Sequence, residues 1–299
     1  MSDLKRSSVQ TETINARPQC LRLRPQQRRF LLFLYVLFLL CMQLFLILPS
    51  LYAERWTERV TVIVADIWIV ICSFFSAVRL VLTNPTIKDL MQYSKSGEDW
   101  TYCTYCRKSR PPRTHHCHTC EACVIRRDHH CLFLGQCVGL ANWRFFLSLV
   151  FYGAVGLSLA SYLNLRFVFG DYFLPPDWSI LFRIACIILP PGLLWLFGCV
   201  FALVLSVTFI YCTNLMFRNE TMSDRRGRSK SLVVNSNSST SEEQVALMHT
   251  TQNVYDLGPR ENVKQFLGIW PLVLFLPFCD SPLTIDGLSF PHSDPAKFH

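Results

Sequence analysis

Half of the cysteines in this chain lie in one short segment, where their spacing is typical of metal binding. Seven of the fourteen fall within the 35 residues from Cys103 to Cys137. Three of the gaps between them are Cys-x2-Cys, a spacing that places two thiolates on one tight turn, within reach of a single tetrahedral zinc ion. Five histidines lie in the same segment: His115, His116, His118, His129 and His130. Two closed sites need eight ligands, so the segment can form two structural zinc sites and leave at least one cysteine free.

A disulfide framework is the alternative explanation for so many cysteines. Disulfides join cysteines in pairs, whereas the number in this segment is odd. The basic residues described below also place the segment in the reducing cytosol, where structural disulfides are rare. We therefore favour zinc.

The residues before Cys131 favour it as the free thiol, although the ligand count alone does not choose among the seven. Cys131 directly follows Asp128, His129 and His130. A cysteine thiol has a pKa of about 8.5, so a neighbouring base is needed to populate the nucleophilic thiolate at neutral pH. A histidine can take the proton, and an aspartate can hold the imidazole in one tautomer. The pattern indicates a nucleophilic cysteine.

Four long apolar segments are expected to hold this site at a membrane. The chain of 299 residues is 51% hydrophobic and only 17% charged, which is too apolar for an ordinary soluble domain. Each segment is close to or longer than the ~20 residues that a helix needs to cross a bilayer. The predicted spans are Phe30–Leu48, Val60–Leu82, Phe145–Phe169 and Leu193–Leu215.

A further apolar stretch, Ile180–Leu189, precedes the fourth span and is separated from it by Pro190 and Pro191. It is too short to cross a bilayer alone. We interpret it as a lumenal lead-in or a kinked extension of the fourth span, and a fifth span is the alternative.

The distribution of basic residues predicts the orientation. Lys and Arg gather before the first span, between the second and third, and after the fourth, whereas loops 49–59 and 170–178 carry two and none. Because cytosolic loops carry the excess of positive charge, both termini and the cysteine-rich segment are expected in the cytosol. The net charge of +8 then indicates contact with anionic lipid rather than nucleic acid.

The expected fold is an all-α polytopic membrane protein, with four transmembrane helices and a cytosolic zinc-stapled cysteine-rich domain between helices two and three. The divisions are a cytosolic leader (1–29), spans one and two with a short lumenal loop (30–82), the zinc domain (83–144), spans three and four (145–217) and a cytosolic C-terminal region (218–299). Within the last, Ser223–Thr251 is rich in Ser and Asn and predicts a flexible linker. Residues 253–278 are expected to form a packing motif. It ends in the apolar run Ile269–Phe278, which is too short to span and is expected to pack on the bundle or lie at the interface.

The segment Asp128–Cys131, read as Asp-His-His-Cys in this spacing, resembles the DHHC family of palmitoyltransferases. The resemblance covers Cys103 to Phe146 and the four-span architecture around it. Asn142–Phe145 resembles the family's Asn-x2-Phe segment at the start of span three. Four residues of a C-terminal family motif are also in register: Tyr255, Gly258, Asn262 and Gly268. The resemblance implies that the aromatic ring of this motif packs inside the domain.

The resemblance also implies an interleaved zinc assignment. One ion would be held by Cys103, Cys106, His116 and Cys123. The other would be held by Cys117, Cys120, His130 and Cys137. Cys131 remains free as the nucleophile, with His129 as general base and Asp128 orienting it. His115 and His118 have no role in the family.

A protein-cysteine S-palmitoyltransferase is the activity that the resemblance implies. Cys131 would take the acyl group from palmitoyl-CoA and pass it to membrane-proximal cysteines of substrate proteins, while the two zinc ions are structural. Arg126 and Arg127 adjoin the motif and are candidates for binding the CoA phosphates; contact with anionic lipid is an equal alternative. We expect residence in endomembranes, either the Golgi or the endoplasmic reticulum.

Two positions depart from the family pattern. Leu132 and Phe133 stand where the family has Pro-Trp, and Phe133 can still cover the site. Thr221–Asp224, read as Thr-Met-Ser-Asp, stands where the family has Thr-Thr-x-Glu, which braces the catalytic region through hydrogen bonds. The other functions considered are a non-catalytic membrane adaptor and a transporter or channel, the latter supported by Asp66 alone.

Overall fold

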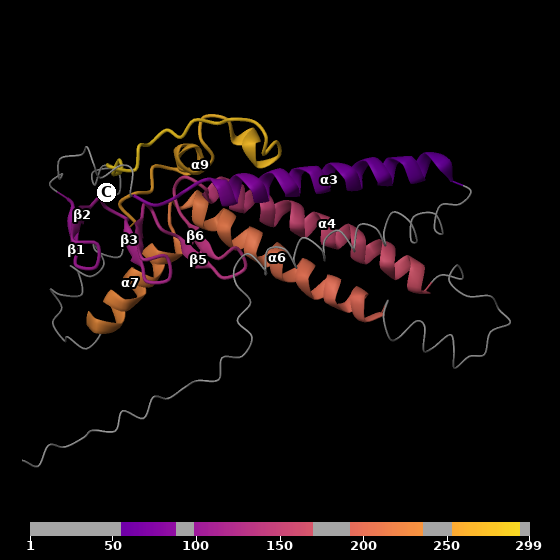
Figure 1. Ribbon diagram of the computed structural model, residues 1–299, viewed down its shortest axis with the longest axis horizontal. Helices are drawn as coiled ribbons and strands as arrows, with labels where there is room; N and C mark the ends of the chain where they lie inside the picture. The colour runs from indigo at the N-terminus through magenta and orange to yellow at the C-terminus, as the bar shows by residue number, and fades with distance from the viewer. Residues whose placement is uncertain (1–54, 88–98, 170–191, 236–252, 294–299) are drawn as a thin grey trace, which may run out of the picture.

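The computed structural model describes residues 55–87, 99–169, 192–235 and 253–293, and three long helices dominate it (Figure 1). The helices are α3 (Trp56–Leu82), α4 (Trp143–Phe169) and α6 (Leu193–Phe217). The predicted first span, Phe30–Leu48, and the alternative fifth, Ile180–Leu189, lie outside the described residues.

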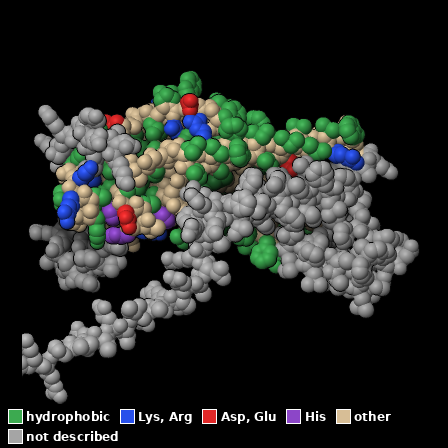
Figure 2. Space-filling view, viewed as in Figure 1, with side chains coloured by type: hydrophobic (Ala, Val, Ile, Leu, Met, Phe, Trp, Pro, Cys, Tyr) green, Lys and Arg blue, Asp and Glu red, His purple; other side chains and the backbone are tan. Residues whose placement is uncertain are grey.

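All three helices are long and apolar enough to cross a membrane, which confirms three of the four predicted spans. Large apolar side chains such as Ile67 on α3 and Leu203 on α6 are exposed. Figure 2 shows hydrophobic side chains along the outer surface of α3. Apolar surface of this extent is characteristic of helices that face lipid.

The central helix of the bundle is α4, which packs against both α3 and α6. Ser76 on α3 and Ser148 on α4 share a buried hydrogen bond of 2.9 Å. Gly153 on α4 lies so close to α6 that a Cβ there would be 2.9 Å from Leu205. Small residues and buried hydroxyls of this kind hold membrane helices together, because lipid provides no hydrophobic driving force between them.

The cysteine-rich domain lies at the end of the bundle where α3 ends, α4 begins and α6 ends (Figure 1). It consists of three antiparallel β-hairpins, each a separate two-stranded sheet. The strand pairs are β1 (Thr101–Cys103) with β2 (Lys108–Arg110), β3 (His115–Cys117) with β4 (Ala122–Val124), and β5 (His129–Cys131) with β6 (Gln136–Val138). The all-α expectation is therefore wrong for this domain. The short Cys-x2-Cys spacing requires a tight turn, and a tight turn returns the chain as a strand.

The expectation of a flexible linker from Ser223 is also wrong in its first part, because α7 is a helix from Met222 to Asn235. Its start carries a reciprocal cap. The Asp224 N–H donates to the Thr221 hydroxyl at 3.1 Å, and the Thr221 N–H donates to the Asp224 carboxylate at 3.0 Å. This capping box satisfies N–H groups that a helix start otherwise leaves unpaired.

The C-terminal region packs back onto the membrane end of the zinc domain. Helix α9 (Pro259–Leu267) is followed by a 3-10 turn, η3 (Pro271–Leu274). Val273 and Leu274 are buried against the bundle, and the Phe275 carbonyl accepts a 2.6 Å hydrogen bond from Tyr152 of α4. Several apolar side chains of the run Ile269–Phe278 remain exposed on the other side: Ile269, Trp270, Leu272, Phe275 and Phe278. The run therefore packs on the helical bundle with one face and exposes apolar side chains on the other.

Candidate active site

The three hairpins of the cysteine-rich domain repeat one design at an interval of 14 residues. Each first strand ends in a cysteine, namely Cys103, Cys117 and Cys131. These pair in register with the first residue of the return strand, respectively Lys108, Ala122 and Gln136. The turns share a left-handed residue four positions after that cysteine: Arg107, Glu121 and Gly135, with φ of 52°, 49° and 65°. The repeated backbone places the three thiols in equivalent positions.

Two four-residue clusters are assembled between successive hairpins, and they match the predicted ligand sets. The clusters are Cys103, Cys106, His116 and Cys123, and Cys117, Cys120, His130 and Cys137. In each, the turn of one hairpin contributes two cysteines. A His–Cys pair that faces across the strands of the next hairpin contributes the other two.

The distances within both clusters fit a tetrahedral metal. The ligand atoms of each set lie within 4.8 Å of one another. The Cys120 and Cys137 sulfurs are 3.7 Å apart, and the Cys123 and Cys106 sulfurs 3.6 Å. Two thiolates on a zinc ion with bonds of about 2.3 Å would lie about 3.8 Å apart. Closed sets of three cysteines and one histidine are typical of structural zinc.

The turn of the third hairpin belongs to neither cluster. Leu134 stands where Cys106 and Cys120 stand in the first two turns, and it packs on the apolar core. Cys131 therefore keeps the backbone position of a metal ligand without belonging to a ligand set. The 14-residue spacing of Cys103, Cys117 and Cys131 is visible in the sequence, and it could have identified Cys131 as the first residue of an incomplete third turn.

Cys131 lies in the apolar cluster where the helices meet the zinc domain. Its exposed fraction is 8%, and the same cluster contains Leu80 of α3, Phe145 of α4 and Cys212 of α6. The Gly135 N–H donates to the Cys131 carbonyl at 2.9 Å and fixes the turn. The thiol is therefore held at the membrane end of the domain.

His129 connects the thiol to a buried carboxylate. Its Nδ1 lies 2.8 Å from Oδ2 of Asp128, whose exposed fraction is 1%, and its ring packs edge-to-face on Phe146. Burial would lower the pKa of His129, yet hydrogen bonds to Asp128 and Cys131 raise that pKa to about 9. Burial is the largest single influence and raises the pKa of the Cys131 thiol. The hydrogen bond and charge of His129, together with backbone hydrogen bonds from Leu134 and Phe133, outweigh burial, so this pKa is lowered overall. The arrangement favours a thiolate beside an imidazolium.

Asp128 is braced by the segment Thr221–Asp224. The Met222 N–H donates to the Asp128 Oδ1 at 2.9 Å, and the Ser223 hydroxyl donates to the Asp128 carbonyl at the same distance. Asp224 is paired with the buried Arg113 at 2.6 Å, which anchors the start of α7 to the zinc domain. The bracing expected of Thr-Thr-x-Glu is thus present, made by the Met222 backbone N–H and the Ser223 hydroxyl.

Asn219 is a structural residue that the sequence did not reveal. It accepts hydrogen bonds from Arg113 at 3.0 Å and from Arg126, and it donates to the Tyr255 carbonyl at 2.7 Å and to Gln265 at 2.9 Å. One buried amide therefore ties the zinc domain to the C-terminal region. Nothing in its local sequence marks it for this role.

The structure does not support Arg126 as a ligand for CoA phosphates. With a φ of 45°, the residue directs its side chain inward, where 2% is exposed. Its guanidinium donates to the Gln265 carbonyl at 3.0 Å and lies 3.6 Å from the centre of the Phe266 ring. Burial, assisted by the positive charge of Arg113, lowers the pKa of Arg126 well below its ordinary value. Arg127 is half-buried beside the cluster residue Cys137, and its contact with CoA stays a prediction.

Four other predicted positions can be placed. Phe133 does not cover the site, because it and Leu132 are exposed, by 76% and 72%. His118 packs against Tyr105 and lies outside both clusters, as does His115.

The C-terminal motif contacts both the zinc domain and the end of α6. The Tyr255 ring lies under the Arg113 guanidinium at 4.6 Å. The Asn262 amide donates to the Phe217 carbonyl at 2.7 Å, which joins α9 to the end of α6.

A cysteine that lies outside both ligand clusters, at the boundary between a helical bundle and a polar domain, is suited to carrying an acyl group between lipid and protein. The class defined here is therefore a membrane-bound thiol acyltransferase.

Comparisons with known proteins agree with this class. A family model described as DHHC palmitoyltransferase matches residues 96–228. The probable palmitoyltransferase ZDHHC24 of Homo sapiens is 33% identical over 226 residues, which cover 70% of each protein. The Mus musculus ZDHHC24 is 33% identical over 229 residues and 72% of each protein. The probable protein S-acyltransferase 15 of Arabidopsis thaliana is 54% identical over 33 residues, which cover 11% of this chain and 13% of that protein.

The chain belongs to the DHHC palmitoyltransferase family. It is a protein S-palmitoyltransferase, an enzyme of the acyltransferase class.

Proposed function

We propose that Cys131 is the nucleophile of a two-step transfer from palmitoyl-CoA to cysteines of membrane-associated proteins. The observation that carries the proposal is the position of Cys131, in a turn built like a metal knuckle but outside both clusters and hydrogen-bonded to His129. His129 acts as general base and acid, and Asp128 holds its tautomer and stabilises its positive charge.

The first step forms the acyl-enzyme. The Cys131 thiolate attacks the thioester carbonyl, a new carbon–sulfur bond forms at Cys131, and the bond to CoA breaks. The proton held on His129 passes to the departing CoA sulfur. In the second step His129 takes the proton of the acceptor thiol, whose sulfur attacks the acyl-enzyme and releases the Cys131 thiolate. One thioester is exchanged for another, so no external energy source is needed.

The acyl chain would be bound by the apolar surroundings of Cys131. Burial of a methylene contributes about 0.8 kcal/mol, so the roughly fourteen methylenes of a palmitoyl chain would contribute on the order of 11 kcal/mol before the costs of binding. Cys131 shares its cluster with side chains from α3, α4 and α6. This supports a chain that enters from the membrane, while the thioester meets Cys131 at the boundary.

Two zinc ions are proposed for the clusters, held by the residues named above. Bound zinc would supply structural stability by linking each turn to the following strands. The metal would take no part in the reaction, because both ligand sets are closed and Cys131 belongs to neither.

The site is proposed to face the cytosol in an endomembrane, either Golgi or endoplasmic reticulum, with four spans and both termini inside. The support is the placement of the zinc domain where α3 ends, α4 begins and α6 ends, which agrees with the distribution of basic residues. The bracing of Asp128 removes the main reason for considering an adaptor. Asp66 is buried on α3, but a single carboxylate does not form a transport pathway.

The proposal is tested by incubating purified protein with labelled palmitoyl-CoA and measuring protein-bound label that hydroxylamine releases. Cys131→Ser should lower the rate of labelling by about 10³-fold or more, because serine lacks an accessible anion at neutral pH. Cys279→Ser, at a half-buried cysteine outside both clusters, is the matched control and should label like wild type. Label retained at full rate by Cys131→Ser would exclude it as the nucleophile.

A further inference from the structure

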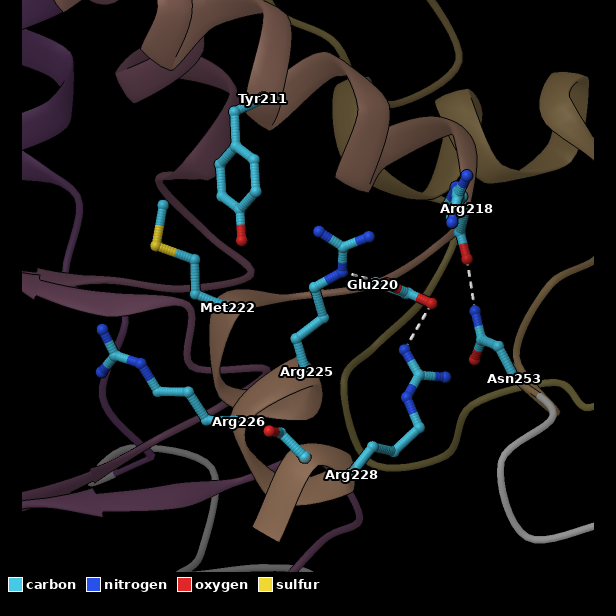
Figure 3. A pocket seen from close by; sticks show the side chains of 9 residues that line it. Tyr211, Arg218, Glu220, Met222, Arg225, Arg226, Arg228 and Asn253 are labelled. Atoms are coloured by element: carbon cyan, nitrogen blue, oxygen red, sulfur yellow. Dashed lines mark hydrogen bonds and ion pairs between the residues drawn. The ribbon is translucent and has the colours of Figure 1, made fainter. Parts of the chain in front are cut away.

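A basic pocket lies beside the catalytic domain, at the junction of α6 and α7. Its volume is about 570 Å³, within the range of small-ligand sites. It is lined mainly by polar and charged side chains (Figure 3): Tyr211, Arg218, Glu220, Arg225, Arg226 and Arg228. None of these residues belongs to the Asp128–His129–Cys131 group or to a metal cluster.

Positive charge in the pocket exceeds the negative charge available to neutralise it. The lining contains four arginines and one carboxylate, so it carries 4 − 1 = +3, and the Arg226 side chain points away from Glu220 (Figure 3). Glu220 is buried, and it pairs with Arg225 at 3.0 Å and with Arg228 through its other oxygen. Arg218 and Arg226 are exposed and have no ion-pair partner among the residues that the structure describes. Glu220 thus fixes two of the guanidiniums and leaves the others available to an anion.

The pocket opens where the chain leaves the membrane. Arg218 directly follows Phe217, the last residue of the third candidate span, and Tyr211 lies about two turns earlier on α6. Phe217 and Ile210 are exposed apolar side chains on the same helix. A ligand with a charged head in the pocket could therefore lay an apolar tail along α6.

We propose that this pocket binds the headgroup of a membrane lipid that carries a phosphomonoester, such as a phosphorylated inositol lipid. Guanidinium groups match phosphate oxygens in both charge and bidentate geometry. A phosphodiester and a phosphomonoester together carry about −2.5 to −3 charges, which complements the +3 of the lining. A zwitterionic headgroup offers no such match. Soluble phosphate esters share this chemistry but lack the tail that would lie on α6.

The proposed site also contacts the catalytic domain. Met222 lines the pocket and donates its backbone N–H to Asp128. The test below measures binding rather than acyl transfer, so its failure would leave the proposed role of Cys131 untouched.

The test uses the full-length, zinc-loaded protein and a short-chain fluorescent phosphatidylinositol 4-phosphate, with short-chain phosphatidylcholine for comparison. Saturable binding is expected for the inositol phospholipid alone. Arg218→Gln with Arg226→Gln should weaken binding about tenfold or more, because two phosphate partners are lost without unpairing Glu220. Arg260→Gln with Lys264→Gln removes the same charge from the exposed side of α9 and should change affinity less than about twofold.

Three results would overturn the proposal. The first is equal affinity for phosphatidylcholine, and the second is an equal loss in both double variants, which would indicate unspecific attraction. The third is that CoA or soluble inositol phosphate binds as tightly as the lipid and loses affinity in the same variant, which would make the pocket a soluble-phosphate site. If the double variant fails to fold, judged by zinc content and melting temperature, Arg226→Gln alone applies the same test, with an expected loss of about fivefold.

Discussion

The second and third hairpins of the cysteine-rich domain share one backbone, and the proposed function gives their first cysteines opposite roles. Cys117 and Cys131 end equivalent strands and precede equivalent turns. Cys117 meets Cys120 in its own turn and His130 and Cys137 from the next hairpin. Cys131 has Leu134 at the position of Cys120, and helix α4 follows its hairpin instead of further strands. The comparison teaches that the proposed zinc ligand and the proposed nucleophile share the same turn and differ in the residues that surround it.

The side chains around the Cys117 and Cys131 sulfurs also differ in a way that fits the two proposed roles. Cys117 lies among three other metal-binding side chains. Cys131 lies against His129 on one side and an apolar cluster on the other. A nucleophilic sulfur needs a lone pair that is not used to bind a metal. The apolar side chains beside Cys131 offer a surface on which an acyl chain can bind.

Replacement of Cys117 should have the largest effect and should separate the two roles. Cys117→Ser removes a ligand from a closed site, so bound zinc should fall from about two per chain to about one. Palmitoylation should be lost as a consequence, because His130 and Cys137 of that cluster flank Cys131 in the third hairpin. Zinc content by elemental analysis and the melting temperature measure the effect. Cys131→Ser is the matched control and should keep both zinc ions and the wild-type melting temperature. Zinc loss in Cys131→Ser would contradict the distinction drawn here.

Replacement of Asp128 should convert Cys131 into a more ordinary thiol. In wild type the proton stays on His129 up to its pKa of about 9, and the pKa of the Cys131 thiol is lowered. Alkylation of Cys131 should therefore persist to lower pH than alkylation of an ordinary cysteine, and slow as pH falls through the lowered thiol pKa. In Asp128→Asn the pKa of His129 should fall towards 6.5 and that of the thiol rise towards about 8.5.

The rate of iodoacetamide labelling across pH measures this change. At pH 7 a thiol of pKa about 8.5 is roughly 3% ionised, so labelling should slow by up to about 30-fold, and the difference should vanish near pH 9. Ser223→Ala, which removes a hydrogen bond to the Asp128 backbone only, should retain the wild-type pH profile. An unchanged profile in Asp128→Asn would contradict the role given to the carboxylate.

Restoring the second cysteine of the third turn should have the smallest effect. Leu134→Cys recreates the spacing of the other turns, but among the described residues no further His–Cys strand pair follows to complete a site. Zinc should stay at about two per chain under reducing conditions, and palmitoylation should fall about two- to fivefold through lost packing. Leu134→Ala should show the same decrease, since it removes the same contacts without adding a thiol. A third equivalent of zinc would show that Leu134 alone keeps metal from Cys131.

The sequence predicted what depends on pattern and missed what depends on tertiary contacts. For the three predicted spans that the structure describes, the ends agree within a few residues, because about twenty consecutive apolar residues have few alternatives. The structure also brings together both predicted ligand sets. These could be predicted because the Cys-x2-Cys spacing indicates metal binding and the family resemblance implies which residues share an ion. The prediction that Arg126 binds CoA was wrong because nothing in the local sequence indicates whether an arginine next to the motif is exposed or buried. Helix α7 was missed because its capping box, Thr221 to Asp224, is short, and because the Arg113 that holds Asp224 is 111 residues away.

The hydrogen bond from Met222 to Asp128 has an evolutionary consequence. Its donor is a peptide group, which every amino acid except proline supplies, so the position can drift without losing the contact. A sequence comparison that considers only residue types would treat such a substitution as loss of the motif. Whether a divergent member keeps this contact therefore depends on the position of its backbone N–H relative to the carboxylate. The residue type at the position does not decide it.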